Sequence, residues 1–438
     1  MSAEPFHLAW FLNGFKVNSW RDQWSGVGGY DLWSPDFYIE FARSLERAGF
    51  DYLILEDSSF VPDAYQDSSE VYLKHAQMVP KFDPAVLAAM LSQFTTRLGI
   101  VTTLSTSEYQ PYMLARQIAT LDHMTRGRAG WNIVTGSSDR AAQNYGRDAL
   151  PPHDERYAIA AEMVDVVTQL WHSWQPDAVV ADRESGVFAD YTKVHTVNFE
   201  GRYFKSRGPL NIPRPPQGRP VLVQAGASPK GRAFASQWAD TIIGYNPIIE
   251  GMKEYRDSVR TMALSHGRKP DDVKVLFLVN PVLGSTDAEA EEIVRRERQE
   301  SYDDPTLSLA MMGFATNIDF SKLELDVPVV EQASSLATNG HQSVLDGFIA
   351  RAGNRTLREM MSGDNGAPQV VGTPETVAAK LDEMMQEIGG DGFLFSLEGM
   401  TRRHIAEVTD GLVPALQRRG LVRRTYTHEH FRDNLFEF

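Results

Sequence analysis

The chain has 438 residues, 42% of them hydrophobic, which is enough to form a large core. Its formal net charge is −15 and no Lys/Arg-rich run segregates positive charge, so nucleic acid is excluded as a partner. The lack of cysteine excludes disulfides, thiolate nucleophiles and thiolate metal sites. No stretch has the length of a membrane span and the first residues lack signal-peptide features, so we expect a cytoplasmic protein without a membrane partner.

Short apolar runs alternate with helical patterns along the chain. The first helix is expected to begin at Ser34-Pro35 and to end at Gly49, because these residues suit a helix start and a helix stop. Further helices are expected over 83–94, 111–122, 287–299, 373–388 and 402–419. Helices are also expected to begin after 138, after 153 and after 228, and one more follows the strand at 241–244 and ends at about 265. Strands are expected at 7–12, 52–55, 98–104, 129–135, 221–224, 241–244, 273–279 and 392–397.

Eight apolar strands alternating with helices predict an α/β protein, specifically a (β/α)8 TIM barrel. A doubly wound open sheet gives the same alternation and remains the alternative. The whole chain, 1–438, is interpreted as one such domain with two insertions. The first, at about 176–218, is rich in Pro, Gly and charge, with short strands expected at 194–197 and 203–205. The second, at about 300–370, has no clear strand, is partly helical and could act as a lid.

The connecting segments carry weaker signals. The long loop at 13–33 contains GVGG at 26–29, but no strand and helix flank it as a phosphate-binding loop requires. A second long loop is expected at 58–83. Arg126 and Arg128 are interpreted as anchors of the turn before the strand at 129–135. The RRGLVRR run near 418 is interpreted as ordinary helix-face charge, and the HEH run at 428–430 as a solvated tail.

Polar residues follow the strands, and in a barrel the carboxyl ends of the strands converge on one face. Asp57 follows the second strand, Thr103 closes the third and Asn132 lies near the end of the fourth. Taken singly, each has a structural explanation, such as capping a turn or satisfying backbone groups. Their convergence is what favours a binding site.

The turn AGAS at 225–228 is the sharpest local signal. Ser228 precedes Pro229 at the start of a helix, so exposed backbone N–H groups and a hydroxyl would meet at a helix N-terminus. This arrangement suits a phosphate. The alternative is that Ser228 is only a helix cap.

A second polar cluster begins the helix after Pro152. His153 and Tyr157 are four residues apart and would lie on the same side of that helix, so they could contact one ligand together. The alternative is a capping His and a packed Tyr. Asp154 and Glu155 could join His153 at a metal, but the chain has no HExxH motif, so no metal is predicted and a metal hydrolase remains a remote alternative.

The longer motifs resemble a known family, the nitrilotriacetate, dibenzothiophene-sulfone and pristinamycin monooxygenase group of the bacterial-luciferase-like flavin-dependent superfamily. The resemblance runs along nearly the whole chain. The segments that carry it are TLDHMTRGRAGWNIVTGSSDRAAQNYG, HDERY, LWHSW, VFADYTKVH and GPLNIPRPPQGRPVLVQAGASPKGR.

This resemblance implies a barrel that binds FMN at the carboxyl ends of its strands. It implies that a separate NAD(P)H:flavin reductase supplies reduced FMN, that O2 provides the transferred oxygen, and that the enzyme is a homodimer or homotetramer. No residue is an evident acid or base, although His153 and Tyr157 are candidates. Residues matching the family positions around the flavin ring and tail are Asp57, Thr103, Asn132, His153 and Tyr157, and those matching the phosphate site are Ala227 and Ser228.

The substrate is less well defined by the sequence. The alkane branch of the resembling family carries Cys and His in its first loop and a Gln further on, whereas this chain has Gly14 and Met78 at the corresponding positions, so an alkane is disfavoured. Aromatic residues crowd the first loops and favour an aromatic or heteroaromatic substrate. A luciferase-like enzyme using a deazaflavin and a non-catalytic flavin-binding barrel remain alternatives. An anionic substrate stays open because of Lys16, Arg21, Lys74 and Lys81.

Overall fold

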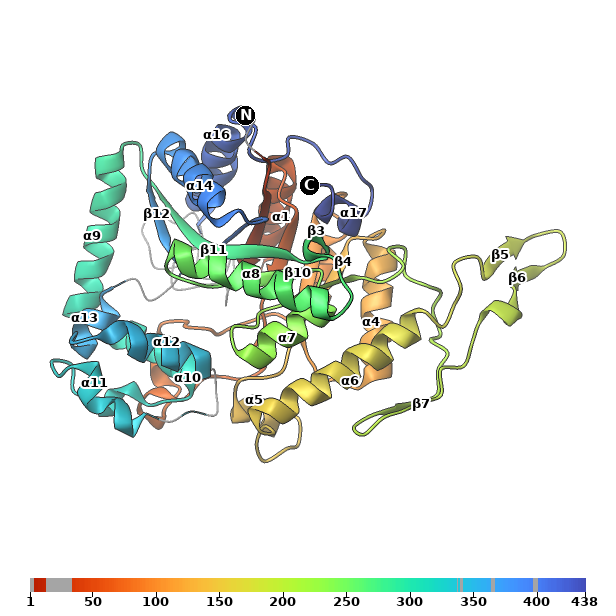
Figure 1. Cartoon of the computed structure of the whole chain (residues 1–438), viewed down its shortest axis with the longest axis horizontal. Coiled ribbons are helices and arrows are strands. Elements are labelled where there is room, and N and C mark those ends of the chain that lie inside the picture. The colour runs from red at the N-terminus through yellow and green to blue at the C-terminus, as the bar shows by residue number, and fades with distance from the viewer. Residues whose placement is uncertain (1–3, 13–33, 337, 339–341, 364–366, 397–400) are drawn as a thin grey trace.

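Eight parallel strands close into a barrel in the computed structural model, which describes residues 4–12, 34–336, 338, 342–363, 367–396 and 401–438 (Figure 1). The strand order runs β10-β9-β4-β3-β2-β1-β13-β11, and β10 also pairs with β11, which closes the sheet, confirms the barrel and rules out the open sheet. The barrel strands are β1 His7–Leu12, β2 Tyr52–Leu55, β3 Gly99–Ser105, β4 Ala129–Val134, β9 Val221–Gln224, β10 Thr241–Gly244, β11 Lys274–Leu283 and β13 Gly392–Phe395.

The expected helices are present, with small shifts at their ends. The helix expected at 402–419 is divided into α15 Arg402–Ala406, a π-helical segment Glu407–Leu412 and α16 Val413–Arg418. The other helices around the barrel are α1 Pro35–Ala48, α3 Pro84–Leu91, α4 Pro111–Met124, α5 Asp139–Asn144, α6 His153–Trp171, α7 Pro229–Trp238, α8 Ile249–Ser265, α9 Asp287–Asp303 and α14 Pro374–Ile388.

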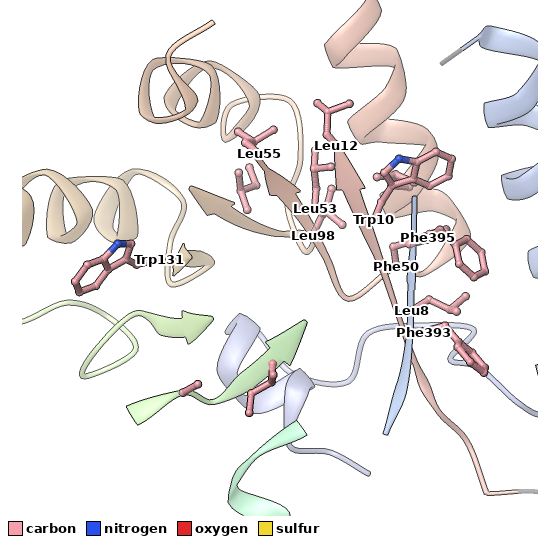
Figure 2. Packing of buried hydrophobic residues seen from close by; sticks show 14 of the residues in the cluster. Leu8, Trp10, Leu12, Phe50, Leu53, Leu55, Leu98, Trp131, Phe393 and Phe395 are labelled. Carbon is pink, nitrogen blue, oxygen red and sulfur yellow. The ribbon is translucent and has the colours of Figure 1, made fainter. Parts of the chain in front are cut away.

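Alternate residues of each strand supply two separate cores, because successive side chains point to opposite faces of a sheet. Leu8, Trp10 and Leu12 of β1 pack outward against the helices, where the Trp10 ring lies 5.1 Å from that of Phe41 on α1 (Figure 2). Ala9, between them in sequence, packs inside the barrel. Strands buried on both faces explain why the sequence shows continuous apolar runs instead of alternation.

The C-terminal segment closes the amino-terminal end of the barrel. Helix α17, Phe431–Leu435, inserts Phe431 against Tyr52, with ring centroids 5.3 Å apart. A side chain at Gly99 would place its Cβ 2.7 Å from the Phe431 ring, so this close approach requires glycine. The HEH run at 428–430 therefore leads into a buried helix and is not a free tail.

A buried ionic group ties this end together. Asp51 accepts hydrogen bonds from the Arg423 guanidinium at 2.6 Å and from the Leu8 N–H at 3.0 Å, and its Oδ1 lies 3.0 Å from His7 Nδ1. The side chains of Asp51, His7 and Arg423 are almost fully buried. The interpretation of the RRGLVRR run as helix-face charge is therefore wrong for Arg423.

Arg128 anchors the turn before β4, as expected from the sequence. Its guanidinium donates hydrogen bonds to backbone oxygens of Thr125, Leu98, Ser92 and Thr95, so it joins the turns that precede β3 and β4. Because it is 2% exposed and its partners are backbone carbonyl groups, it is structural.

The first insertion contains two hairpins, and only part of its prediction holds. The strand expected at 194–197 is absent there, where Val194 makes only an isolated bridge to Trp174, and the one expected at 203–205 is β8, Lys205–Ser206. The hairpin of β5 Val179–Asp182 and β6 Val187–Ala189 extends from the body of the molecule (Figure 1). The second hairpin pairs β7, Phe199–Glu200, with β8.

The second insertion builds a separate apolar cluster with the loop that follows β2. Within that loop, expected to have no regular structure, lie a 3-10 turn at Tyr65–Asp67 and α2, Glu70–Lys74. Tyr72 is fully buried, and its hydroxyl donates to the Ala310 carbonyl oxygen at 2.8 Å. The insertion contains α10 Thr306–Thr316, α11 Val329–Gln332, α12 Gln342–Ala352, α13 Leu357–Met361 and, at its end, β12 Gln369–Gly372, which pairs with β11.

The GVGG run, with Gly14, Lys16 and Arg21, lies outside the described residues. Among the described residues, no helix is long and apolar enough to span a bilayer.

Candidate active site

The sequence-predicted site residues all lie at the carboxyl ends of the barrel strands. They form two groups. Asp57, Thr103 and Asn132 come from β2, β3 and β4 and the segments just after them, whereas His153, Tyr157, Ala227 and Ser228 come from α6 and from the turn between β9 and α7. The strand order β2-β3-β4-β9 places the two groups side by side.

Thr103 and Asn132 are register partners on neighbouring strands and both are buried. The Asn132 side-chain nitrogen donates a hydrogen bond of 2.9 Å to the Thr103 hydroxyl. This contact leaves Asn132 Oδ1 buried and without a partner among the described residues. A buried, unpaired oxygen costs about 1–3 kcal/mol, so a ligand N–H is the expected partner.

The turn between β9 and α7 brings backbone very close to backbone. A side chain at Gly226 would place its Cβ 2.5 Å from the carbonyl carbon of Gly231, and one at Gly231 would lie 2.8 Å from the Gly226 Cα. Ser228 caps α7, its hydroxyl accepting from the Gly231 N–H at 3.1 Å. Ala227 is exposed beside it. Both explanations of Ser228 therefore remain, because a capped helix N-terminus can also bind an anion.

Helix α6 presents Tyr157 to this turn. A side chain at Gly231 would place its Cβ 2.8 Å from the Tyr157 hydroxyl, which therefore lies at the N-terminus of α7. Burial raises the pKa of Tyr157, and a hydrogen bond with Ser228 opposes this effect. The His153 ring packs edge-on to Tyr157 with centroids 5.1 Å apart, as the four-residue spacing predicts, and its Nδ1 lies 3.0 Å from Asp154 Oδ1.

Gln224 is a site residue that the sequence analysis missed. It is the last residue of β9, is 3% exposed, and pairs in register with Ile133 next to Asn132. Its Oε1 is a second buried oxygen without a partner in the described part of the chain, and its side chain also hydrogen-bonds Tyr157. The signal was present: a polar residue ends an otherwise apolar strand, VLVQ.

Asp57 lies among other charged groups just after β2. Burial, followed by the neighbouring Glu56 carboxylate, raises the pKa of Asp57 from 3.8 to about 7. Lys81 acts in the opposite direction, although its ammonium group lies 2.7 Å from Glu56 and donates to the Ser58 hydroxyl at 2.6 Å. An acid held half neutral near pH 7 is suited to proton transfer.

Replacing the Asp57 carboxyl with an amide should stabilise the protein at alkaline pH. The folded pKa of Asp57 is raised, so the folded state holds the proton more tightly than the unfolded state, and stability falls as the pH rises from about 4 to about 7. An amide at this position cannot ionise and avoids this loss. We therefore expect Asp57→Asn to raise the midpoint of thermal unfolding at about pH 8 and to leave it unchanged near pH 4. Equal midpoints across that range would contradict the assignment.

An aromatic pair joins the loop after β2 to the second insertion. Phe60, from the loop after β2, stacks on Phe314 of α10 with centroids 5.7 Å apart. Lys81 lies 5.6 Å from the centroid of the same Phe314 ring. The Lys81 ammonium group thus forms an ion pair with Glu56 and lies over an aromatic ring. Lys74 is exposed on α2. Neither lysine therefore offers an unpaired cation near the strand ends.

Other candidates lie elsewhere or are not supported. A cavity of about 640 Å³ between α9 and β12, lined by Val294, Tyr302 and Val371 among others, includes none of the predicted site residues. In the described ranges, no three His, Asp or Glu side chains lie close enough to hold a metal ion.

The fold is a closed parallel (β/α)8 barrel, and buried polar side chains and a helix N-terminus lie together where its strands end, which is where barrel enzymes bind their ligands. The model of the luciferase-like monooxygenases matches residues 21–392. The chain belongs to the luciferase-like monooxygenase family, and it is a flavin-dependent monooxygenase that acts on a small organic substrate.

Similar proteins cover almost the full length of the chain. Dibenzothiophene-sulfone monooxygenase of Rhodococcus erythropolis (strain XP) is 36% identical over 98% of this chain and 96% of its own length. Component A of nitrilotriacetate monooxygenase from Aminobacter aminovorans is 34% identical over 97% and 94%. Among solved structures, riboflavin lyase with modified FMN and riboflavin is 30% identical, covers 99% of this chain and 96% of its own, and has a TM-score of 0.89.

Proposed function

We propose that the protein uses reduced FMN, supplied by a separate NAD(P)H:flavin reductase, and O2 to oxygenate an uncharged, ring-containing organic molecule. The proposal rests on two kinds of binding group that lie at one end of the barrel. Asn132 and Gln224 each bury an oxygen that needs a donor, and the N-terminus of α7 offers backbone N–H groups to an anion. The FMN in the riboflavin lyase structure supports the choice of cofactor.

FMN has a partner for both kinds of group, with N–H donors in its ring system and an anionic phosphate at the end of its tail. Its ring system has N–H donors, which would face the Asn132 and Gln224 oxygens, and its phosphate would lie at Ala227 and Ser228 beside Tyr157. Thr103 holds Asn132 in position through their 2.9 Å hydrogen bond. His153 packs against Tyr157 and would border the flavin tail. Once bound, reduced FMN supplies the electrons that allow one atom of O2 to enter the substrate while the other leaves as water.

The protein's own task is to orient the cofactor and to exclude water. The segment 300–370 as a lid remains a prediction. Its apolar cluster includes Tyr65 and Tyr72 of the loop after β2, so any closing movement would have to carry that loop as well. Asn317 donates a 3.3 Å hydrogen bond to the Ser137 carbonyl oxygen, beside the site.

The contacts near Asp57 favour an uncharged substrate over a polycarboxylate. Lys81, one of the cations that kept an anionic substrate open, is bound by Glu56, and the Phe60–Phe314 stack offers aromatic surface. The two relatives differ in this respect: one is named for the uncharged dibenzothiophene sulfone and the other for nitrilotriacetate. We therefore expect turnover of aromatic sulfones or related rings and none of aminopolycarboxylates.

The proposal is tested by mixing the protein anaerobically with reduced FMN and then adding O2. We expect tight binding of reduced FMN and a change in the rate at which O2 oxidises it, because the bound flavin is shielded from water. Oxidation at the same rate with and without protein would contradict the proposal. Binding of a deazaflavin with no affinity for reduced FMN would instead favour the deazaflavin enzyme.

The phosphate side of the site predicts how FMN affinity responds to mutation. Tyr157→Phe removes the hydroxyl at the N-terminus of α7, and we expect it to weaken FMN binding about tenfold, equivalent to the roughly 1.4 kcal/mol of one good hydrogen bond. Riboflavin, which lacks the phosphate, should be affected less. His153→Ala should lower the yield of product per reduced flavin. The control is His266→Ala, exposed at the end of α8. The site assignment fails if both variants keep the affinity and product yield of the unaltered protein.

The cytoplasmic location remains a prediction from the sequence, and the reductase partner and assembly as a homodimer or homotetramer remain predictions from the resemblance. Co-purification with a flavin reductase and measurement of the molar mass in solution would test the partner and the assembly.

A further inference from the structure

Asp57 matches a flavin-binding position of the resembling family, but no part in the chemistry has been assigned to its carboxyl group. Asp57 follows β2 by two residues, and β2, β3 and β4 are neighbours in the barrel. Leu55 pairs in register with Thr102, so Asp57 follows one residue beyond the level at which Thr103 and Asn132 meet on the next two strands. Asn132 is 3% exposed and its Oδ1 is unpaired among the described residues, which independently indicates that a ligand reaches this level.

Lys81, the cation that lowers the pKa of Asp57, is hydrogen-bonded to other groups. Lys81 is buried, with 5% of its side chain exposed, and its ammonium group contacts both oxygens of Glu56, at 2.7 and 3.0 Å, and the Ser58 hydroxyl at 2.6 Å. These three contacts use the three donors of a lysine. Asp57 is therefore influenced by Lys81 through space, without a hydrogen bond from it.

Acidic groups face Asp57 from each surrounding segment. Glu56 comes from the end of β2, Asp83 from the cap of α3 and Glu108 from the turn after β3, and all three act to raise the pKa of Asp57. Burial raises the pKa of Glu108 itself, and Arg147 is the nearby cation that opposes this rise. Tyr109 and Tyr145 complete the surroundings and also respond to Asp57. A second carboxylate charge in this setting is unfavourable, which favours the neutral acid.

We propose that Asp57 holds a proton on its carboxyl group at neutral pH and donates it to the bound ligand during oxygen transfer. The inference rests on the proposed function. Reduced FMN, O2 and substrate give oxidised FMN, oxygenated substrate and water, and the oxygen atom that leaves as water must receive protons. One proton passes from the Asp57 carboxyl oxygen, leaving a carboxylate, and solvent restores it after release of the product, so Asp57 is not consumed.

The experiment compares pH profiles of product yield in Asp57→Asn, Glu56→Gln and Glu108→Gln. If Asp57 must be protonated, product yield per reduced flavin falls as the pH rises through about 7. Glu56→Gln removes a negative neighbour and releases Lys81, so the fall should move to lower pH by about one unit. Glu108→Gln should also move the fall in product yield to lower pH. It replaces Glu56→Gln in the test if that variant folds poorly. Asp57→Asn should abolish the fall and lower the yield at pH 6 at least about tenfold.

A second readout does not depend on turnover. A difference proton titration of the protein without flavin, unaltered against Asp57→Asn, should show one group titrating near pH 7. Flavin binding should survive in Asp57→Asn, because an amide still donates a hydrogen bond. The matched control is Asp63→Asn, an acid of the same loop that pairs with Arg140 at 2.9 Å, and it should change neither readout.

The outcomes separate this inference from the proposed function. If the unaltered protein yields no oxygenated product with any ring substrate, the proposed function fails. If it does yield product, but the fall stays at the same pH in both Gln variants or the titration shows no group near pH 7, then Asp57 is not the proton donor while the proposed function stands.

Discussion

Gly231→Val should abolish flavin binding while the barrel remains folded. The Cβ of any residue at this position would lie 2.8 Å from both the Gly226 Cα and the Tyr157 hydroxyl, so valine must push the start of α7 away from the turn after β9. That movement separates the anion-binding N–H groups from the rest of the site. We expect FMN affinity to fall at least about 100-fold, roughly 2.8 kcal/mol at 1.4 kcal/mol per factor of ten.

The measurement is quenching of flavin fluorescence, with circular dichroism to verify folding. The matched control is Gly347→Val on α12, where the one atom of the described residues recorded near an added Cβ is the end of the Arg351 side chain at 3.3 Å. This control should bind FMN normally. FMN binding by Gly231→Val with ordinary affinity would show that the phosphate lies elsewhere.

Among the substitutions proposed, Asp51→Ala should lower the free energy of unfolding most. Asp51 lies at the opposite end of the barrel from the candidate site. Its carboxylate compensates the buried charge of Arg423 at 2.6 Å, and removing one partner of a buried pair costs about 3–5 kcal/mol. Burial disfavours the charged form of Asp51, but His7 and Arg423 outweigh it and lower its pKa. Because the folded pKa is depressed, this stabilisation is present at neutral pH and is lost as the pH falls below the ordinary value near 3.8.

Unfolding in denaturant measures this loss. The control is Asp410→Ala, which breaks an ion pair of similar length with Arg47, 2.8 Å, in which both side chains are more than half exposed. That change should cost less than about 1 kcal/mol. A similar loss in both variants would mean that the Asp51 group contributes no more than a surface pair.

The barrel could be predicted from the sequence because each of its strands and helices is marked by residues within that element or next to it. The apolar runs at 7–12, 52–55, 221–224 and 241–244 match their strands at both ends, since a polar or turn-forming residue lies within two positions of each end. The strand expected at 194–197 is absent, because the conformation of such a surface segment is set by what it packs against and not by its own pattern. The helix at Glu70–Lys74 was missed for the same reason: Tyr72 is buried by residues of the second insertion, more than 200 positions away.

The sequence indicates candidate positions for the site but not the electrostatics around them. Asp57, Asn132 and Ser228 are candidates because polar residues at strand ends and a Ser-Pro helix start can be seen in the sequence. The neutralisation of Lys81 by Glu56 joins residues 25 positions apart, and only the fold brings them together. Arg423 shows the same limit, since a run of arginines gives no sign of which one will be buried.

Isotopically labelled dioxygen tests the central claim most directly. The protein, a flavin reductase, NAD(P)H, FMN and a panel of aromatic sulfones and aminopolycarboxylates are combined under labelled O2, and the products are weighed by mass spectrometry. We expect an uncharged ring substrate to gain one labelled oxygen atom and the aminopolycarboxylates to gain none. Consumption of NAD(P)H with only hydrogen peroxide formed, or a product whose new oxygen comes from water, would contradict it.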